Sequence, residues 1–536
     1  MTSTLTPGTD LGDTPVAVPV LGRATEQLAG CRVLVLNWRD VRHSQAGGAE
    51  LYAHEISKRW VAAGVHVTWL TARDAGQTAH DEIDGIEIRR AGATMSVYAR
   101  AALSLLRGSV RQRFDAVVDC QNGIPFFSPL FTRNTVPTVQ VVHHVHQDQF
   151  STRFSPTGAA VGRLLEGRVA RRVYSGKRTV AVSASTRQEL RRRLKFDGPI
   201  DVVTNGMTQH PRTGPTATRA DRPTIVLTSR LVPHKRVDLL LHAVWAALPH
   251  VPDLQVEIIG DGPELTSLRR TAVELGLGRV VRFHGRLPDA ERDALMDSAW
   301  LTTSTSDGEG WGLVVLEGAA AGVPCLALRA TGIRDSVLDG VTGWLVDGID
   351  DFAAALPRTL AELADPGRAR EISQACRDWA SCFGWDRSAE LLAGSVLSEM
   401  RSFHRVDAED SHLPPADRSA LHRAATRRRA RSDMTTVAHF GHDRPWDAAA
   451  ALRLTDEVAV RVAPGSEGPG ELVALLRGCD EVDALAVLGR IGAQDPYVRL
   501  ASRHELLGGP TAVAVGRTRP GPTSAATEGA ADLGAR

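Results

Sequence analysis

The stretch from Asp307 to Leu328, DGEGWGLVVLEGAAAGVPCLAL, restricts the possible folds more than any other part of the chain. Residues 300–303 have the apolar character of a short buried strand, two glycines then predict a loop, and the apolar run from Leu313 predicts a helix. The order strand, glycine-rich loop, helix is typical of α/β domains with a parallel sheet. We therefore expect at least one doubly wound domain in this part of the chain.

Two carboxylates, Glu309 and Glu317, lie eight positions apart in this stretch. Eight steps of about 100° return to within about 80° of the starting direction, so a loop Glu309 and a helical Glu317 can face one cleft. The same helix start offers N–H groups and a positive dipole end to an anion such as a diphosphate. Because sugar and ribose hydroxyls favour carboxylates, a sugar nucleotide would suit both features. The alternative is an ordinary surface Glu and a helix Glu, since E-x7-E is common by chance.

Length and composition limit the class of protein. A chain of 536 residues exceeds what one core supports and predicts two or three domains. Its 43% apolar and 23% charged residues exclude wholesale disorder, and the net charge of +1 predicts no nucleic-acid partner. The six cysteines are scattered without a C-x-x-C pair, which argues against a zinc site and favours a reducing compartment. Without a signal-peptide pattern or an apolar run of membrane-spanning length, we expect a cytoplasmic protein.

Strand-like segments alternate with helix-like segments in two series. The first series begins at 31–36, CRVLVL, a continuous apolar run of the kind buried on both faces of a parallel sheet. The second begins at 224–229, after a proline-bounded segment that predicts a hinge. From 404 the character changes, with a charged linker followed by strand-like pieces at 457–462, 484–488 and 511–515 and a helix-like piece at 471–477.

The E-x7-E spacing within EGWGLVVLE, followed by GVPCLA, resembles the nucleotide-sugar site of retaining glycosyltransferases of family 4, which have the GT-B fold. The resemblance implies an α/β fold with two Rossmann-like doubly wound domains facing across a cleft, and the strand-like and helix-like pieces after 434 predict a small C-terminal α/β extension in addition. The resemblance also implies a last helix that crosses back onto the first domain. The expected organisation is a flexible leader (1–29), an N-terminal acceptor-side domain (30–212), a C-terminal donor-binding domain (213–385), a crossover helix (386–402), a linker (403–434), an extension of unknown role (435–515) and a disordered tail (516–536).

The resemblance implies which residues contact a nucleoside-diphosphate sugar. In the opening stretch they are Glu309, Gly310, Trp311, Gly312, Leu313 and Glu317. Gly47 and Gly48 resemble the family's GGAE loop near the donor phosphates, and Gly260 and Gly262 form a GDGP turn that suits close approach of a ligand. Taken alone, two glycines before a helix or a lone GDGP would indicate only a turn.

Two cations, Arg230 and Lys235, stand five residues apart in SRLVPHKRVDLLLHA, at a strand end and a helix start. Each can meet a different oxygen of a diphosphate while the helix start adds N–H donors. In the family an Arg and a Lys at these positions bind the donor phosphates; the alternative is two exposed bases in a loop. His234 and Arg236 stand where relatives often carry an acid and a glycine, which changes the expected rigidity of the loop.

Three histidines, His143, His144 and His146, follow the predicted strand at 138–142. They could be metal ligands, a substrate-contacting histidine with neighbours, or loop histidines without a role. Metal binding is least favoured, because no carboxylate or cysteine stands at ligand spacing in the cluster, and we expect no metal. In the family a histidine at the end of this strand contacts the transferred sugar, and we expect His143 rather than His144 in that role.

Two further segments leave alternatives open. Residues 331–335, TGIRD, stand where relatives carry GGIPE, which puts the donor role of that loop in doubt. Residues 151–200 hold twelve Lys or Arg against three acids, with four of the arginines at helical spacing: Arg163, Arg168, Arg171 and Arg172. This segment is either a solvated helical face or a basic surface for an anionic membrane or a phosphate-bearing acceptor.

The expected function is that of a retaining glycosyltransferase in cell-envelope polysaccharide, glycolipid or glycoside synthesis. Arg230, Lys235 and the helix start would stabilise the leaving diphosphate in place of a divalent ion, so no cofactor is expected. Glu317 would hold the ribose, Glu309 would face the transferred sugar, and His143 completes the predicted catalytic set. The acceptor would be a glycan, a lipid-linked molecule or a small molecule, at a cytoplasmic or peripheral inner-membrane location.

Two other classes of function remain open. A sugar-nucleotide epimerase of GT-B architecture would share the cleft and recruit His143 and Glu309 as acid and base, whereas a non-catalytic sensor would bind the nucleotide without turnover. A dehydrogenase is disfavoured, because neither half opens with G-x-G-x-x-G after its first strand. Specificity is expected in the loops at 37–48 and 121–127, whose mixed residues carry no identifying pattern.

Overall fold

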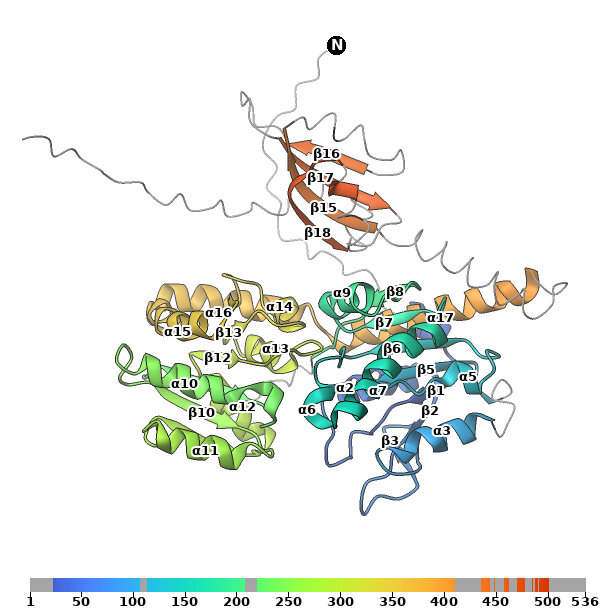
Figure 1. Ribbon diagram of the computed structural model, residues 1–536, viewed down its shortest axis with the longest axis horizontal. Coiled ribbons are helices and arrows are strands. Elements are labelled where there is room, and N and C mark those ends of the chain that lie inside the picture. The colour runs from blue at the N-terminus through green and yellow to red at the C-terminus, as the bar shows by residue number, and fades with distance from the viewer. Residues whose placement is uncertain are drawn as a thin grey trace, which may run out of the picture. The chain divides into compact units, whose positions relative to one another are not determined.

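The computed structural model describes residues 23–106, 113–207 and 219–409, and in the C-terminal region residues 435–443, 448, 457–461, 470–477, 484, 487–489 and 491–500. The chain divides into two compact units, residues 1–426 and 427–536. The first unit contains two α/β domains, each built on its own sheet (Figure 1). None of the described helices is both long enough and apolar enough to cross a bilayer.

The N-terminal domain is built on an eight-stranded sheet in the order β3-β4-β2-β1-β5-β6-β7-β8 among the described residues. Every pairing is parallel except that of β3 with β4 at the edge. The strands are β1 (Arg32–Leu36), β2 (His66–Thr71), β3 (His80–Ile83), β4 (Ile86–Arg90), β5 (Ala116–Gln121), β6 (Thr138–Val142), β7 (Thr179–Ala181) and β8 (Ile200–Val202).

Helices cover both faces of this sheet, which explains the continuous apolar run of β1. Val33 and Val35 face a cluster shared with α2 (Gly48–Ala62) and α17 (Trp385–Glu409). Leu34 and Leu36 face a separate cluster shared with α3 (Ser96–Leu106). The remaining helices of the domain are α5 (Ser128–Phe131), α6 (Phe150–Arg153), α7 (Pro156–Leu164), η1 (Leu165–Val169), α8 (Ala170–Val173) and α9 (Ala184–Arg192).

The second domain has a six-stranded sheet in the order β11-β10-β9-β12-β13-β14, parallel throughout. Its strands are β9 (Thr224–Thr228), β10 (Gln255–Ile259), β11 (Val281–Gly285), β12 (Leu301–Ser304), β13 (Cys325–Leu328) and β14 (Gly343–Val346). Its helices are η2 (Pro233–Lys235), α10 (Val237–Ala247), α11 (Leu265–Glu274), α12 (Asp289–Ser298), α13 (Leu313–Ala320), α14 (Ile333–Ser336), α15 (Ile349–Ala364) and α16 (Pro366–Ser381). Two doubly wound domains confirm the predicted fold class.

Helix α17 belongs to the first domain in space although it follows the second in sequence. Trp385, at its start, is buried, and the indole of Trp60 donates a hydrogen bond to the carbonyl of Ala389 at 3.0 Å. The two chain crossings between the domains touch each other, because the Met207 N–H donates to the Phe383 carbonyl at 2.9 Å. Gly206 fits beside Trp385 only without a side chain, since an added Cβ would lie 2.5 Å from the Trp385 nitrogen.

Two predicted boundaries differ from the structure. Residues 23–29 were expected in the flexible leader, but Arg23–Gln27 form α1 and Leu28 is fully buried. The cause is a contact far away in sequence, because the Glu390 carboxylate on α17 accepts hydrogen bonds from the Ala24 and Thr25 N–H groups at 2.6 and 3.0 Å. The crossover helix was expected over 386–402 and extends to residue 409. The rest of the leader and of the linker, and the predicted tail, lie outside the described residues.

The C-terminal unit contains an antiparallel sheet in the order β16-β17-β15-β18. Its strands are β15 (Thr435–His442), β16 (Glu457–Arg461), β17 (Gly470–Arg477) and β18 (Gln494–Leu500). The predicted helix at 471–477 is wrong, because this segment is β17 and is hydrogen-bonded on both sides. The predicted strand at 484–488 is helical at its described positions, and the segment at 511–515 lies outside them.

Candidate active site

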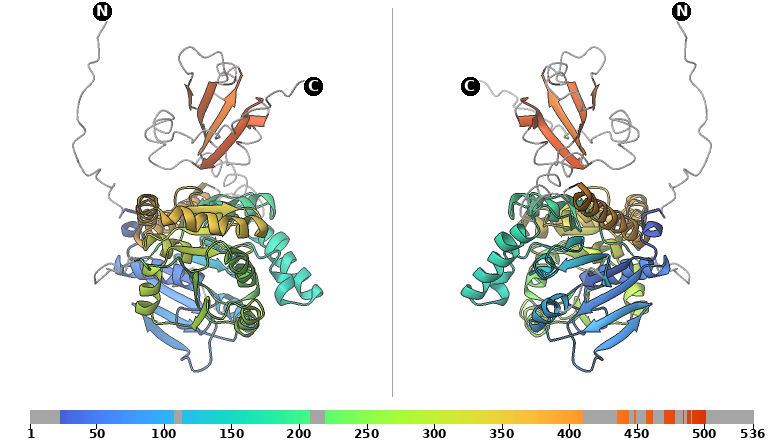
Figure 2. Two further views of the ribbon diagram at one scale, coloured as in Figure 1. Left: turned by 90° about the vertical axis from the view of Figure 1, so that its left-hand side faces the viewer. Right: turned by 90° about the vertical axis from the view of Figure 1, so that its right-hand side faces the viewer.

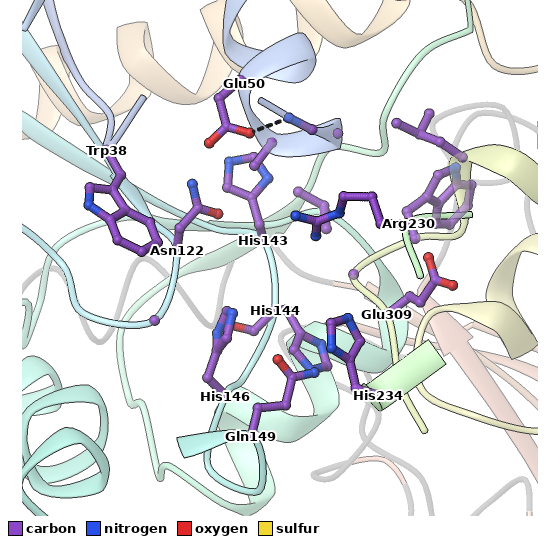
Figure 3. A pocket seen from close by; sticks show the side chains of 18 of the residues that line it. Trp38, Glu50, Asn122, His143, His144, His146, Gln149, Arg230, His234 and Glu309 are labelled. Atoms are coloured by element: carbon purple, nitrogen blue, oxygen red, sulfur yellow. Dashed lines mark hydrogen bonds between the residues drawn. The ribbon is translucent and has the colours of Figure 1, made fainter. Parts of the chain in front are cut away.

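A cavity of about 470 Å³ lies between the two domains of the first unit. Figure 3 shows side chains from both domains pointing toward it, with His143 and Glu50 on one side and Arg230 and Glu309 on the other. Of the residues predicted from the sequence, those that line it are Gly47, Gly48, His143, Arg230, Lys235, Glu309, Gly310, Trp311, Gly312, Leu313 and Glu317.

The remaining two predicted donor-binding residues, Gly260 and Gly262, are not among the lining residues. Their lack of a side chain serves packing beneath the loop that carries Arg230. A Cβ added at Gly260 would lie 1.8 Å from the Ser229 carbonyl oxygen, and one at Gly262 would lie 2.2 Å from that of Leu231. The GDGP turn therefore supports the Arg230 loop from behind instead of forming the wall of the cavity.

His143 follows the last residue of β6 and presents a neutral ring to the cavity. Its side chain is 7% exposed and meets the Tyr52 ring edge-on at 5.1 Å between centroids. Burial, with a smaller effect of His146, lowers the pKa of His143 to about 3. Among the described residues, no group forms a hydrogen bond with its buried Nε2 atom. A ligand in the cavity could meet this unsatisfied polar atom.

Glu309 and Lys235 form an ion pair with 2.7 Å between the carboxylate Oε1 and the ammonium Nζ. The Ser306 hydroxyl donates a further hydrogen bond to Glu309 at 2.9 Å. Burial raises the pKa of Glu309, but Lys235 and Ser306 together outweigh it and hold this pKa below its ordinary value. The sequence suggested the donor phosphates as the partner of Lys235 and the transferred sugar as the partner of Glu309. In the structure the two side chains pair with each other, and Glu309 is ionised.

Helix α13 delivers the second carboxylate and an uncapped N-terminus. Gly312, at φ 90°, turns the chain into the helix, and as a glycine this N-cap residue has no side chain to cap the first N–H groups. The first residues of the helix, Leu313 and Val314, line the cavity. Glu317, in the next turn of the helix, also lines it. Glu317 also acts on Arg292: burial lowers the pKa of Arg292, but Asp293 and Glu317 raise it above the ordinary value.

Two glycines allow the domains to approach closely around the cavity. A Cβ on Gly310 would lie 2.1 Å from the His143 carbonyl oxygen, and one on Gly48 would lie 2.9 Å from Leu313 Cδ1. The first contact involves backbone and cannot be relieved by a side-chain rotation. The GGAE loop is itself held by Glu50, whose carboxylate accepts a hydrogen bond from the Gly47 N–H at 2.8 Å.

Several lining residues were missed or only grouped by the sequence reasoning. They are Trp38, Asn122, His144, His146, Gln149 and His234. Asn122 comes from the loop at 121–127, which Asp119 anchors through bonds from the Phe126 and Ser128 N–H groups, both at 3.1 Å. His144 was set aside in favour of His143, yet it is half-buried in the same cavity wall, and its Nε2 atom lies 3.0 Å from the Gln149 amide. The HHVH sequence at 143–146 indicated that histidines lie at the site, but it did not show which of them line the cavity.

The residues that the structure describes include no group of three or more His, Cys, Asp or Glu side chains arranged to hold a metal ion. The lining carboxylates are Glu50, Glu309 and Glu317. Glu50 is 2% exposed and already pairs with Arg39 at 3.2 Å, and Glu309 pairs with Lys235.

Two Rossmann-like domains with such a site between them define the GT-B class of glycosyltransferase-like proteins, and solved structures share this fold. A sucrose-phosphate synthase from Thermosynechococcus elongatus matches with a TM-score of 0.56 at 18% identity, over 71% of this chain and all of that one. HepE of Anabaena, solved with UDP and glucose, matches with a TM-score of 0.52 at 19% identity, over 69% of this chain and all of that one.

Sequence comparisons place the chain within a family. The model described as Glycosyltransferase Family 4 matches residues 46–208, and that described as Glycosyl transferases group 1 matches residues 214–378. The chain therefore belongs to glycosyltransferase family 4.

Curated relatives match part of the chain. A GDP-mannose-dependent alpha-(1-6)-phosphatidylinositol monomannoside mannosyltransferase of Mycolicibacterium smegmatis is 40% identical over 187 residues, which are 32% of this chain and 48% of that protein. A D-inositol 3-phosphate glycosyltransferase of Streptomyces avermitilis is 32% identical over 257 residues, which are 44% of this chain and 54% of that protein. The chain thus spans about half the length of these relatives.

Proposed function

We propose that this protein transfers a hexose from a nucleoside-diphosphate sugar to a hydroxyl of an acceptor. The observation that carries the proposal is the cavity in which Arg230, Lys235, Glu309 and Glu317 of one domain face His143 of the other. The M. smegmatis relative is named for its GDP-mannose dependence, so GDP-mannose is the first donor to test. We propose cell-envelope polysaccharide, glycolipid or glycoside synthesis as the setting; one relative is named for a phosphatidylinositol mannoside and another for D-inositol 3-phosphate.

Each charged group has a task in this proposal. Arg230, Lys235 and the uncapped start of α13 stabilise the diphosphate as its negative charge grows. Because the phosphates compete with Glu309 for the Lys235 ammonium, donor binding frees the Glu309 carboxylate for the sugar hydroxyls and for positive charge at the anomeric carbon. Glu317 accepts hydrogen bonds from the ribose. The neutral His143 ring contacts the transferred sugar with its unsatisfied Nε2.

We propose retention of the anomeric configuration through front-face displacement. Of the lining carboxylates, Glu50 is occupied by Arg39 and the Gly47 N–H, while this proposal assigns Glu317 to the ribose and Glu309 to the sugar hydroxyls and the anomeric charge. The proposal therefore uses no covalent nucleophile on the opposite face. The bond from the anomeric carbon to the phosphate oxygen breaks, the bond to the acceptor oxygen forms on the same face, and the acceptor proton passes to the departing phosphate. NMR of the product measures the outcome, and an inverted anomeric centre would rule this mechanism out.

We propose that no divalent ion takes part, because Arg230, Lys235 and the α13 start already supply positive charge at the phosphates. Turnover should then persist in EDTA. Activity that disappears in EDTA and returns with manganese would contradict the proposal.

The main experiment is a donor panel read in two ways. Thermal shift with GDP- and UDP-sugars identifies the donor, because a bound ligand stabilises the folded state, and release of the nucleoside diphosphate measures transfer. Glu309→Gln and Lys235→Ala should lower turnover by about 100-fold or more, as expected for lost transition-state charge stabilisation. The matched controls are the exposed Glu274→Gln and Lys58→Ala, which should remain within twofold of the wild type.

Other outcomes separate the alternatives. Donor binding without transfer across an acceptor panel would favour a sensor and overturn the proposal. An altered sugar configuration in the donor, formed without acceptor, would favour an epimerase. Variants at Glu309 and Lys235 that retain full turnover would show that the chemistry lies elsewhere.

We also propose that the arm formed by α6 and α7 contacts an anionic membrane. Figure 2 shows this turquoise segment standing out from the edge of the first domain. Phe154, Val161 and Leu164 are 48%, 54% and 46% exposed, and Phe150 and Phe154 also line the cavity. Arg168, Arg171 and Arg172 are exposed on the helical turns that follow. Apolar side chains beside arginines suit insertion at a lipid headgroup layer.

The structure reduces the basic segment to fewer usable charges than the sequence suggested. Arg187 and Lys177 are buried, Arg178 pairs with Asp201 at 2.8 Å, and Arg191 donates to the carbonyls of Phe196 and Gly198. The exposed arginines of η1 and α8 remain for a surface contact. This contact would make the protein cytoplasmic and peripheral at the inner face of the plasma membrane.

Vesicle co-sedimentation tests the membrane contact. Vesicles with about 30% phosphatidylserine should recover the protein at low salt, and the pair Val161→Ser with Leu164→Ser, or Arg171→Ala with Arg172→Ala, should reduce recovery severalfold. Val273→Ser on α11, which alters a 73% exposed valine far from the arm in sequence, is the control. Equal recovery with neutral vesicles would overturn the charge argument, and unaffected recovery by the variants would exclude the arm.

A further inference from the structure

A second set of contacts joins the two domains beside the cavity, between α14 and the first turns of α9. The Asp335 carboxylate accepts a hydrogen bond from the Ser185 N–H at 2.9 Å. The Arg334 guanidinium donates to the Ser185 hydroxyl at 2.6 Å and to the Gln188 side-chain oxygen at 2.9 Å. We call these contacts of Arg334 and Asp335 with Ser185 and Gln188 the α14–α9 latch.

The latch uses the N-terminus of a nine-residue helix. Its own N-cap, Ser183, accepts a hydrogen bond from the Thr186 N–H at 3.0 Å, so Asp335 satisfies a different N–H of the first turn from the other domain. A carboxylate is also favoured there by the helix dipole. Ser185 is 2% exposed, so water competes poorly for the two bonds that it makes.

The residues just before the latch, Thr331 and Gly332, contact the backbone of Glu309 directly. The Glu309 N–H donates to the Thr331 carbonyl at 2.9 Å. A Cβ added at Gly332 would lie 2.3 Å from the Glu309 carbonyl oxygen, so the α14 loop presses on the Glu309 backbone. On its other side, Gly310 meets the His143 carbonyl. The Glu309 loop is therefore held between the α14 loop and the end of β6.

We propose that Arg334 and Asp335 are positioning residues that hold the cleft closed and fix the Glu309 loop against the first domain. These two residues stand at the positions where the family pattern has Pro and Glu. A proline in place of Arg334 could make neither of the two side-chain hydrogen bonds. The two Arg334 contacts thus depend on a residue at which this chain departs from the family pattern, whereas a glutamate at position 335 could still accept from the Ser185 N–H. The effect of the latch on catalysis, though not its effect on the domains' separation, rests on the proposed function.

The primary test measures separation of the domains without any substrate. Spin labels at the exposed Lys58 on α2 and Glu274 on α11, in a chain with Cys31, Cys382 and Cys479 replaced by serine, report the interdomain distance by double electron–electron resonance. The unliganded wild type should show one dominant distance. Arg334→Ala with Asp335→Ala should add a second, different distance or broaden the distribution. An unchanged distribution would overturn the latch.

Kinetics supply an independent readout once a donor is known. The double variant should lower kcat/KM for the donor about tenfold. The single variant Asp335→Glu should keep most of the wild-type kcat/KM, because its carboxylate can still accept a hydrogen bond from the Ser185 N–H. The control is Arg329→Ala with Asp339→Ala, which removes a 2.8 Å ion pair between two exposed residues, together with their bonds to Asp347 and Leu345, all within the second domain. It should change neither readout. Equal losses in the latch and control variants would make the effect one of general stability and overturn the proposal. A chain without transferase activity would leave the distance test valid.

Discussion

At the scale of single residues, buried charges fix the loops that surround the cavity. Arg90, at the end of β4, donates to the Asp40 carboxylate at 2.6 Å, and both side chains are at most 1% exposed. Asp40 lies in the loop at 37–48, which also carries Trp38 and Gly47 of the cavity wall. The strand thus holds a loop whose mixed sequence would not specify one conformation by itself.

Loss of Arg90 should therefore be costly. Arg90→Ala leaves the Asp40 charge buried without its partner, and we expect the free energy of unfolding to fall by about 3–5 kcal/mol. The neighbouring Arg89, which pairs with Glu87 at the surface, is the matched control, and Arg89→Ala should cost below about 1 kcal/mol. Urea unfolding measures both variants. Equal effects would show that the buried pair does not hold the loop.

His143 predicts a dependence of stability on acid. Its pKa of about 3 lies below the ordinary value, so folding favours the neutral ring. The contribution is complete above about pH 6.5 and is lost as the pH falls toward 3, with about 2 kcal/mol lost between pH 7 and 5. His143→Asn should show a smaller loss of unfolding free energy over that interval. A variant with the same pH dependence as the wild type would contradict the burial argument.

At the scale of elements, the loop between β12 and α13 depends on glycine for its contact with the first domain. Gly310→Ala places a methyl group against the His143 carbonyl oxygen, where backbone must move to make room. We expect at least a tenfold fall in kcat/KM, with a lower Tm. Gly308→Ala is the control, because its methyl group would lie 3.4 Å from the His144 ring, and it should have little effect. Full activity of Gly310→Ala would show that this close approach is not needed for catalysis.

Strands of the two large sheets could be predicted because their apolar runs are buried on both faces. The predicted strand at 138–142 has the same limits as β6. The segment 471–477, ELVALLR, failed because leucine and alanine favour a helix in isolation, whereas pairing with β15 and β16 decides its conformation. Strand β3 was missed because its sequence, HDEI, lacks apolar alternation and pairs only at the sheet edge.

The candidate site divides in a similar way. Charged residues within a recognisable local pattern, such as Arg230, Lys235 and Glu317, could be predicted. Contacts between distant segments could not be predicted. The residues next to Glu309 in sequence do not indicate its ion pair with Lys235, and those next to Asp335 do not indicate its hydrogen bond with Ser185. Gly260 was assigned to the ligand because glycine next to a strand end serves backbone packing and ligand approach equally well.

At the scale of the whole molecule, the described residues of each compact unit form hydrophobic clusters of their own. The clusters of the first unit contain no buried residue beyond Val396, and those of the C-terminal unit begin at Val437. A chain ending at residue 426 should therefore fold, with a Tm within a few degrees of the full chain and the same donor-induced shift. Ending the chain at Gly384 removes α17, exposes Trp60 and its neighbours, and should prevent folding of the first domain. Loss of donor binding in the longer fragment would give the C-terminal unit a part in the site.

The meeting of the two chain crossings at Met207 and Phe383 has a mechanical consequence. Two domains joined at adjacent points form a hinge. They can rotate about an axis through these points, but they can hardly slide past each other or separate. Residues beside the pivot, such as Asn205, whose side chain reaches the Gly48 carbonyl at 3.4 Å, would keep their neighbours throughout the swing. Residues at the rim of the cavity farthest from this hinge would move the most, so a substrate would enter from that side.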